Sequence, residues 1–217
     1  YVIGMALGQA LAHAAPDVPE SRYPELGARY RHHYTQHQDD LSLFDGTLPL
    51  LNELKAKNHL LAVATGKSRR GLDEVLHTVE LKGMFDASRT ADETRGKPHP
   101  LMLQELMAEL GVPPDRVLMI GDTTHDLQMA VNAGCASVGV SYGAHEREAL
   151  AEHAPLFIAH STAELSHWLA AHGRAADPHE HPVAQGHRAG QAHPGRDVDR
   201  VAQHAVVIDR RAGVDDD

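Results

Sequence analysis

Between residues 49 and 173, short apolar runs alternate with segments whose apolar residues recur at helical spacing. Short, continuous apolar runs are typical of buried parallel strands. Strands that alternate with helices of about ten residues form right-handed β-α-β units, in which helices cover both faces of the sheet. The sequence therefore predicts an α/β fold with a parallel sheet. The expected strands are HLLAVAT (59–65), a weaker MFDAS (84–88), RVLMIGD (116–122), ASVGV (136–140) and LFIA (156–159).

The helices between these strands carry their own start and stop signals. Ser68 is a plausible N-cap, and Ser161 with Glu164 has the spacing of a capping box. Gly111 and Gly134 each follow a helical pattern directly, where glycine commonly ends a helix. These signals place helices before, between and after the expected strands.

The two ends of the chain differ from this core. Residues 1–43 show helical spacing interrupted by prolines and no strand pattern, so we expect two or three short helices. Residues 173–217 contain no Leu, Lys or aromatic residue. Such a segment buries too little surface to offset its chain entropy, and we interpret it as disordered or non-homologous. Its irregularly spaced histidines make metal binding a less favoured alternative, and translation in a shifted reading frame would explain the same composition.

The composition argues against several classes of binding partner. The chain has 217 residues, 42% of them hydrophobic, and a formal charge of −10. No run of Lys or Arg is interleaved with aromatic residues, which argues against binding nucleic acid or an anionic membrane. The single Cys135 excludes an internal disulfide, and no apolar run is long enough to span a bilayer. We therefore expect a cytoplasmic protein that binds small molecules; its oligomeric state leaves no signal.

Polar residues follow three of the expected strands. In a parallel sheet, ligands bind at the carboxyl ends of the strands. Thr65 and Gly66 follow the first strand, where a hydroxyl and backbone N–H groups could hold phosphate, although Thr-Gly is also an ordinary turn. Lys97 precedes Pro98, which holds its backbone extended, so its ammonium could neutralise a phosphoryl oxygen; an exposed loop lysine is the alternative.

Two carboxylates follow the strand RVLMIGD. Asp122 stands at the strand end and Asp126 lies one helical turn further on. Two carboxylates at a buried strand end repel each other unless a cation is present, which fits Mg²⁺ bound by oxygen ligands. The alternative is that Asp122 or Thr123 merely caps the next helix and Asp126 occupies its first turn. The combination with Thr65 and Lys97 is more specific than any one of these signals.

The segments LLAVATGK, GKPHP and MIGDTTHDLQMAVNAG resemble three sequence motifs of the haloacid dehalogenase-like hydrolases, in particular of their phosphoglycolate phosphatase-like branch. The similarity extends over about residues 1–171. It implies a Rossmann-like core in residues 44–172 and a helical cap, of which residues 1–43 would be the later part.

The resemblance also implies roles for single residues. Thr65 would hydrogen-bond the transferring phosphoryl group, while Gly66 and Lys67 would shape the phosphate loop. Lys97 would stabilise the nucleophile and the developing charge. A Mg²⁺ ion would be held at Asp122, with Asp126 in support.

The family's attacking aspartate should lie on a strand before the cap, and this core lacks that first strand. LFDGTL (43–48) looks like the family's Asp-x-Asp-Gly-Thr signature, with Leu43 at the attacking position, but it lies at the return from cap to core. We expect Gly46 to turn the chain into a helix there. The true nucleophile should precede Tyr1, so this chain by itself is expected to be inactive.

The implied reaction is Mg²⁺-dependent hydrolysis of a small phosphorylated metabolite, with 2-phosphoglycolate as the best candidate, through an aspartyl-phosphate. A sugar-phosphate mutase would share the core motifs. A non-catalytic phosphate- or metal-binding relative would fit the missing nucleophile. The presence together of Thr65, Lys97, Asp122 and Asp126 favours an enzyme.

Overall fold

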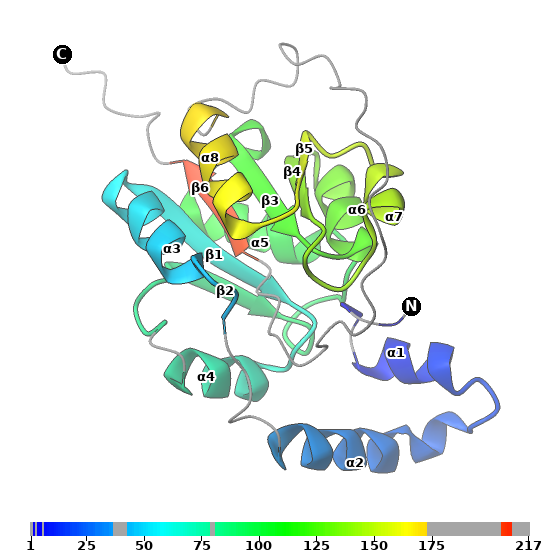
Figure 1. Ribbon diagram of the computed structural model, residues 1–217. Coiled ribbons are helices and arrows are strands. Elements are labelled where there is room, and N and C mark those ends of the chain that lie inside the picture. Colours follow the sequence, from blue (N-terminus) through cyan, green and yellow to red (C-terminus); the bar gives the residue numbers. More distant parts are fainter. Residues whose placement is uncertain are drawn as a thin grey trace.

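The computed structural model describes residues 2, 4–5, 7–36, 43–78, 81–172 and 205–209. Figure 1 shows a central sheet with helices on both faces. The helices are α1 (Leu7–Ala14), α2 (Tyr23–Gln36), α3 (Thr47–Ala56), α4 (Arg69–Thr78), α5 (Leu101–Leu110), α6 (Thr124–Ala133), α7 (Arg147–Ala151) and α8 (Thr162–His172), with short 3₁₀ turns at Glu20–Arg22 and Pro114–Arg116. The strands are β1 (His59–Thr65), β2 (Ala87–Thr90), β3 (Val117–Gly121), β4 (Ala136–Val140), β5 (Phe157–Ala159) and β6 (Ala205–Asp209).

The sheet has the order β2-β1-β6-β3-β4-β5. Strands β1 and β2 pair in parallel, as do β3 with β4 and β4 with β5. The predicted parallel α/β fold is thus confirmed, and the five predicted strands are present. The second begins three residues later than predicted, since the ladder starts at Ala62 and Ala87. Just before it, the N–H of Leu61 donates to the Asp86 side chain at 2.8 Å.

Strand β6 occupies the centre of the sheet. It runs antiparallel between β1 and β3, and Val207 is opposite Leu61 on one side and Leu118 on the other. The prediction of a disordered segment therefore does not hold for residues 205–209, while the remainder of 173–217 lies outside the described residues. The composition of the whole segment concealed a local run, AVVI, that is rich in β-branched residues. Among the described strands, β6 holds the position between β1 and β3.

Two apolar layers fix the helices on the sheet. Leucines of α3 and α8 pack with Leu61, Leu118 and Val138 on one face. Residues of α5 and α6 pack with Ala62 and Met119 on the other. Because neighbouring residues of a strand point to opposite faces, both faces of β1 are apolar and all seven of its residues are buried. This two-sided burial explains why the strand appeared in the sequence as a continuous apolar run.

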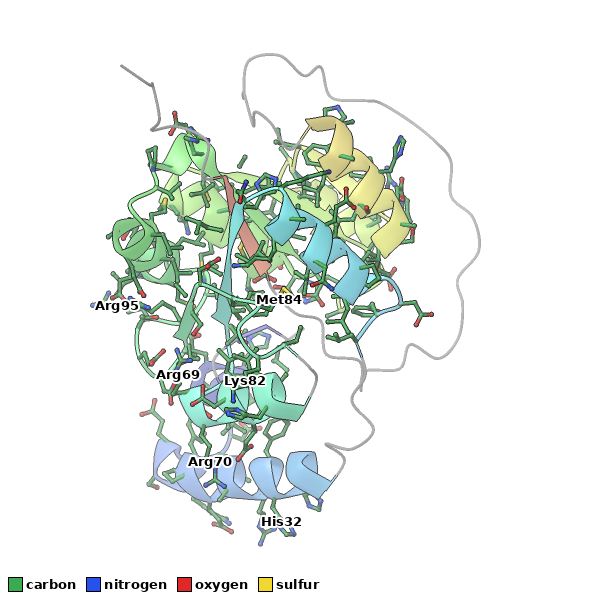
Figure 2. All side chains as sticks on the ribbon, turned by 90° about the vertical axis from the view of Figure 1, so that its left-hand side faces the viewer. His32, Arg69, Arg70, Lys82, Met84 and Arg95 are labelled. Atoms are coloured by element: carbon green, nitrogen blue, oxygen red, sulfur yellow. The ribbon has the colours of Figure 1, made fainter. Side chains whose placement is uncertain are left out.

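The N-terminal segment is helical, as expected, with α1 and α2 joined through the 3₁₀ turn. No residue of α1 is buried. Figures 1 and 2 both show α2 lying beside α4, away from the sheet. None of the helices in the described part of the chain is long and apolar enough to cross a membrane.

The segment LFDGTL forms the turn that begins α3. Gly46 has a φ of +84° and precedes the first helical residue, Thr47. A Cβ at Gly46 would lie 3.5 Å from Thr162 at the start of α8, and Phe44 contacts Tyr142 edge to face. The turn therefore has the local structural role that the sequence predicted. The predicted helix ends at Gly111 and Gly134 are also confirmed, with φ of +66° and +74°.

Candidate functional site

The predicted site residues gather at one edge of the sheet. Thr65 is the last residue of β1, and Asp122 directly follows β3. Asp126 lies in the first turn of α6, and Lys97 lies in the loop between β2 and α5. The parallel strands β1 and β3 bring their carboxyl ends to the same edge, on either side of β6. All four side chains are buried, with 0 to 7% of each residue exposed.

The loop after β1 holds its threonine by a local hydrogen bond. The backbone N–H of Lys67 donates to Thr65 Oγ1 at 3.2 Å. This contact uses the oxygen as an acceptor, so the hydroxyl proton can be donated to another group. Burial lowers the pKa of the Lys67 ammonium. The loop thus presents a hydroxyl and a partly desolvated ammonium at the strand end.

The N-terminal segment lies against both site loops. A Cβ at Gly66 would come within 2.8 Å of the Met5 carbonyl oxygen and 3.0 Å of that of Gly4. Gly4, with a φ of +90°, is in turn so close to Thr123 that its own Cβ would lie 2.8 Å from Thr123 Oγ1. The absence of a side chain at Gly66 therefore permits the close approach of the backbone of residues 4 and 5. Sequence reasoning alone did not predict this contact.

Lys97 and Asp126 form a buried ion pair. Lys97 Nζ lies 2.5 Å from Asp126 Oδ1, and both side chains have no exposed surface. The other oxygen, Asp126 Oδ2, accepts hydrogen bonds from the N–H and hydroxyl of Thr123 at 3.2 and 2.7 Å, which completes a capping box on α6. Burying two charges is costly, and such a pair contributes little net stability unless its geometry is well satisfied. A fully buried lysine beside a strand end is therefore better explained by function than by stability.

Asp122 is held by the loop that follows β4. The N–H of Ala144 donates to Asp122 Oδ2 at 2.9 Å, and the N–H of His145 donates to the Asp122 carbonyl at 3.0 Å. His145 Nδ1 accepts from the N–H of Thr124 at 3.2 Å. Burial and the neighbouring His125 lower the pKa of His145. Sequence reasoning missed this loop, although its position directly after a predicted strand, ASVGV, was a signal of the same kind as the other three.

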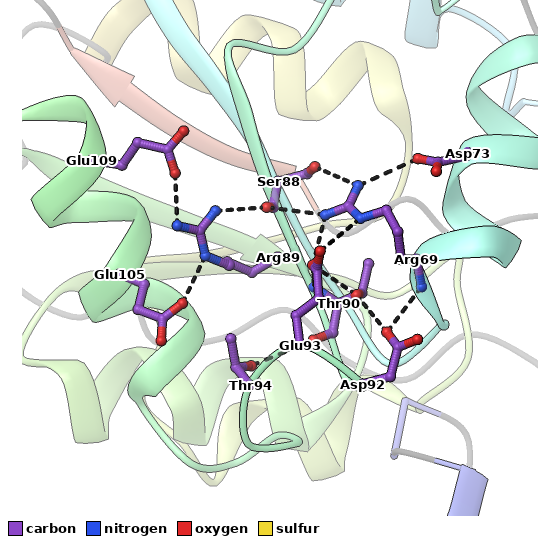
Figure 3. A network of polar contacts seen from close by, with 10 residues as sticks. All are labelled: Arg69, Asp73, Ser88, Arg89, Thr90, Asp92, Glu93, Thr94, Glu105 and Glu109. Carbon is purple, nitrogen blue, oxygen red and sulfur yellow. Dashed lines mark hydrogen bonds and ion pairs between the residues drawn. The ribbon is translucent and has the colours of Figure 1, made fainter.

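A charged network joins two loops of the site (Figure 3). The N–H of Arg69 donates to Asp92 at 2.9 Å, and the Arg69 guanidinium binds Glu93 at 2.7 Å. The Thr90 hydroxyl lies within 2.8 Å of carboxylate oxygens of both acidic residues. Arg69 follows the loop after β1, and the acidic residues lie on the path from β2 to Lys97. The network therefore fixes these two loops relative to each other.

The donor set suits Mg²⁺ in its chemistry. Mg²⁺ prefers oxygen ligands and is commonly bound by one or two carboxylates together with substrate phosphates and water. Asp122 offers a buried carboxylate at the strand end. Both oxygens of Asp126 already contact Lys97 or Thr123, which favours a supporting role for Asp126. Among the described residues, no group of three His, Cys, Asp or Glu side chains could hold a metal by itself.

Comparison with known proteins identifies the family. Residues 2–140 match the model of the haloacid dehalogenase-like hydrolases. Pyrophosphatase PpaX of Bacillus cereus (strain AH820) is 30% identical over 161 residues, which are 73% of this chain and 74% of the relative. The phosphoglycolate phosphatase of Vibrio vulnificus (strain CMCP6) is 32% identical over 166 residues, 76% of this chain and 72% of the relative.

The fold agrees with this comparison. The crystal structure of a predicted phosphatase from Clostridium acetobutylicum superposes with a TM-score of 0.71 at 24% identity, over 78% of this chain and 79% of that one. The similarity inferred from the three motifs is thereby confirmed at the level of sequence and of fold. The chain belongs to the haloacid dehalogenase-like hydrolase family.

Proposed function

We propose that this chain forms most of the catalytic core of a Mg²⁺-dependent phosphatase that hydrolyses a small phosphate monoester. The observation that carries the proposal is the buried Lys97–Asp126 pair at the edge of the sheet where β1 ends in Thr65 and Asp122 follows β3. Phosphoryl transfer depends mainly on positioning and on neutralising charge on the phosphoryl oxygens. A desolvated ammonium, a hydroxyl donor and a carboxylate for a divalent cation supply these functions at one strand edge.

Each residue has a defined task in this proposal. The Thr65 hydroxyl donates to a phosphoryl oxygen while its own oxygen accepts from Lys67. Lys97 faces the negative charge that develops on the phosphoryl group, and Asp126 holds the ammonium in place. Mg²⁺ bound at Asp122 would neutralise further charge on the phosphate oxygens.

The attacking group in the proposed reaction is an aspartate. Its carboxylate oxygen bonds to phosphorus, the ester oxygen leaves and takes a proton, and water then releases orthophosphate from the aspartyl-phosphate. Asp126 is engaged with Lys97, and Asp45 lies in the turn before α3. We therefore place the nucleophile before Tyr1, on a strand that would need the position between β1 and β3 now held by β6.

Two substrates deserve testing first. Phosphoglycolate is favoured by the resemblance of the motifs and by the relative from Vibrio vulnificus. Pyrophosphate is the second candidate, because a relative 30% identical to this chain is a pyrophosphatase. Both are small, strongly anionic phosphate compounds that would use the same charge-neutralising groups.

The test is a substrate panel on the protein together with the upstream segment proposed above. Orthophosphate release from 2-phosphoglycolate, pyrophosphate and p-nitrophenyl phosphate should require Mg²⁺ and fall sharply in Lys97→Met. A sugar 1-phosphate assayed for conversion to the 6-phosphate without phosphate release distinguishes a mutase. Tight phosphate binding without turnover of any of these compounds would favour the non-catalytic alternative.

A further inference from the structure

The loop after β4 makes two consecutive backbone contacts with one residue. The N–H groups of Ala144 and His145 donate to Oδ2 and to the carbonyl oxygen of Asp122, at 2.9 and 3.0 Å. Asp122 directly follows β3, the strand beside β4, and is 1% exposed. Hydrogen bonds to a charged group are stronger than those between neutral groups. The contact at Oδ2 therefore restricts the orientation of the Asp122 carboxylate, whereas the contact at the carbonyl oxygen restricts only the backbone.

Gly143 allows this loop to approach so closely. A Cβ at this position would lie 2.3 Å from Asp122 Cβ and 2.4 Å from Asp122 Oδ2, much closer than non-bonded atoms can come. Its φ lies outside the left-handed range that favours glycine. The requirement for glycine is thus steric, and it is imposed by the side chain of Asp122 itself.

The side chain of His145 attaches the same loop to the start of α6. Its Nδ1 accepts from the backbone N–H of Thr124 at 3.2 Å, at the first residue of α6, and His145 is 6% exposed. Helix α6 also carries Asp126, the partner of Lys97. The imidazole therefore connects the loop that holds Asp122 to the helix that holds the buried ion pair.

We propose that Gly143, Ala144 and His145 form a clamp that fixes the Asp122 carboxylate in the orientation in which it binds a divalent cation, and that His145 is a positioning residue. This inference rests on the metal role proposed above for Asp122. Residues that orient a metal ligand commonly contribute about 10- to 100-fold to metal affinity. The clamp acts through backbone donors and one imidazole, none of which needs to touch the metal.

Manganese binding to this chain tests the clamp without relying on catalysis. Mn²⁺ is the probe, and its dissociation constant is measured by electron paramagnetic resonance of the free ion. Gly143→Ala should weaken binding by about tenfold or more, because the new methyl group displaces Asp122. The matched control is Gly139→Ala on β4, whose Cβ would meet only ordinary contacts of 3.4–3.6 Å and which should bind Mn²⁺ as the wild type does.

Two variants of His145 separate positioning from packing. His145→Asn keeps an acceptor close to the position of Nδ1, whereas His145→Phe fills the volume without one. We expect Asn to retain most of the Mn²⁺ affinity and Phe to lose about tenfold, even where their melting temperatures agree. Equal Mn²⁺ affinities for wild type, Gly143→Ala and His145→Phe would overturn the clamp.

Asp122→Asn distinguishes failure of the clamp from failure of the proposed function. If Asp122→Asn abolishes Mn²⁺ binding while the clamp variants bind normally, the metal role of Asp122 is supported and the proposed clamp is refuted. If Asp122→Asn binds Mn²⁺ as the wild type does, or if the wild type binds none, both the metal role of Asp122 and the proposed clamp are refuted.

Discussion

Lys97 and Asp126 lie 2.5 Å apart at the edge of the sheet, and neither side chain has any exposed surface. The lysine comes from a loop between β2 and α5, and the aspartate from the first turn of α6. The pair therefore connects two β-α units through charges that solvent does not screen. This relationship determines what removing either partner should do.

Replacing Lys97 by Met should strongly destabilise the fold, because it leaves the Asp126 carboxylate buried without its cation. We expect a loss of about 3–5 kcal/mol in the free energy of unfolding, measured by urea denaturation. Lys57→Met is the matched control, since Lys57 pairs with Glu53 on the surface and its loss should have little effect on stability. Similar losses for the two variants would contradict the assignment of a tightly coupled buried pair.

Substituting Gly66 by Ala should displace the N-terminal segment. The added methyl group would lie 2.8 Å from the Met5 carbonyl oxygen, and such overpacking costs about 1–3 kcal/mol unless the neighbour moves. Limited proteolysis should then show faster cleavage before Tyr23. Gly8→Ala, where nothing lies within 4 Å, should leave the cleavage rate unchanged. An unchanged rate in Gly66→Ala would place residues 4 and 5 elsewhere in solution.

Glu93 should contribute to stability in a pH-dependent way. The Arg69 guanidinium, supported by Thr90, lowers the pKa of the Glu93 carboxyl from 4.5 to about 2. The pKa of Glu93 is lower in the folded protein than in the unfolded chain. Its contribution to stability is therefore complete above about pH 4.5, and it disappears as the pH falls toward 2. The stability difference between wild type and Glu93→Gln, from urea denaturation at several pH values, should therefore shrink over this interval. A difference that stays constant with pH would show that the ion pair contributes nothing.

Strand β6 should be needed for the sheet. Val207 has a strand on each side, so its backbone N–H faces a neighbour whichever way it points. Val207→Pro removes that donor from the middle of the sheet and should cost at least about 1 kcal/mol in urea denaturation. Val207→Thr keeps both the N–H and the branched Cβ, and it should cost less. Equal stability for wild type and Val207→Pro would mean that β6 does not pair in solution.

The chain as printed should release no phosphate from p-nitrophenyl phosphate in the presence of Mg²⁺. The physical reason is that the proposed nucleophile lies outside this sequence, while Thr65, Lys97 and Asp122 can only bind and neutralise. A colorimetric assay with and without Mg²⁺ measures this directly. Clear Mg²⁺-dependent turnover that Asp122→Ala abolishes would mean that an attacking group lies within these 217 residues.

The order of strands and helices could be predicted from the sequence because burial on two faces leaves a continuous apolar run. His59–Thr65 and Val117–Gly121 are such runs, and the structure buries every residue in them. The polar residues at their ends followed from the rule that ligands bind at the carboxyl ends of parallel strands. The motifs around Thr65, Lys97 and Asp122 were specific enough together to identify the family.

Other features depend on contacts between segments that are far apart in sequence. The pairing of β6 with β1 and β3 could not be predicted, because one short run in a polar segment does not reveal which strands it will join. The contact of residues 4 and 5 with Gly66, and that of Gly143 with Asp122, appear only when the backbones are placed. The sequence indicated Gly66 as part of a loop that could hold phosphate, but it did not reveal that residues 4 and 5 lie against it.

The sequence by itself determined the α/β class, the approximate positions of strands β1 to β5 and the family, since these follow from local periodicity and from motifs at strand ends. Only the tertiary structure decided how the site residues divide their tasks. Asp126 is bound to Lys97 and Thr123, and Asp122 is held by the loop after β4. The reason is physical: which carboxylate contacts a lysine and which contacts a backbone N–H depends on distances of a few ångströms across strands and helices, and residue spacing along the chain does not encode them.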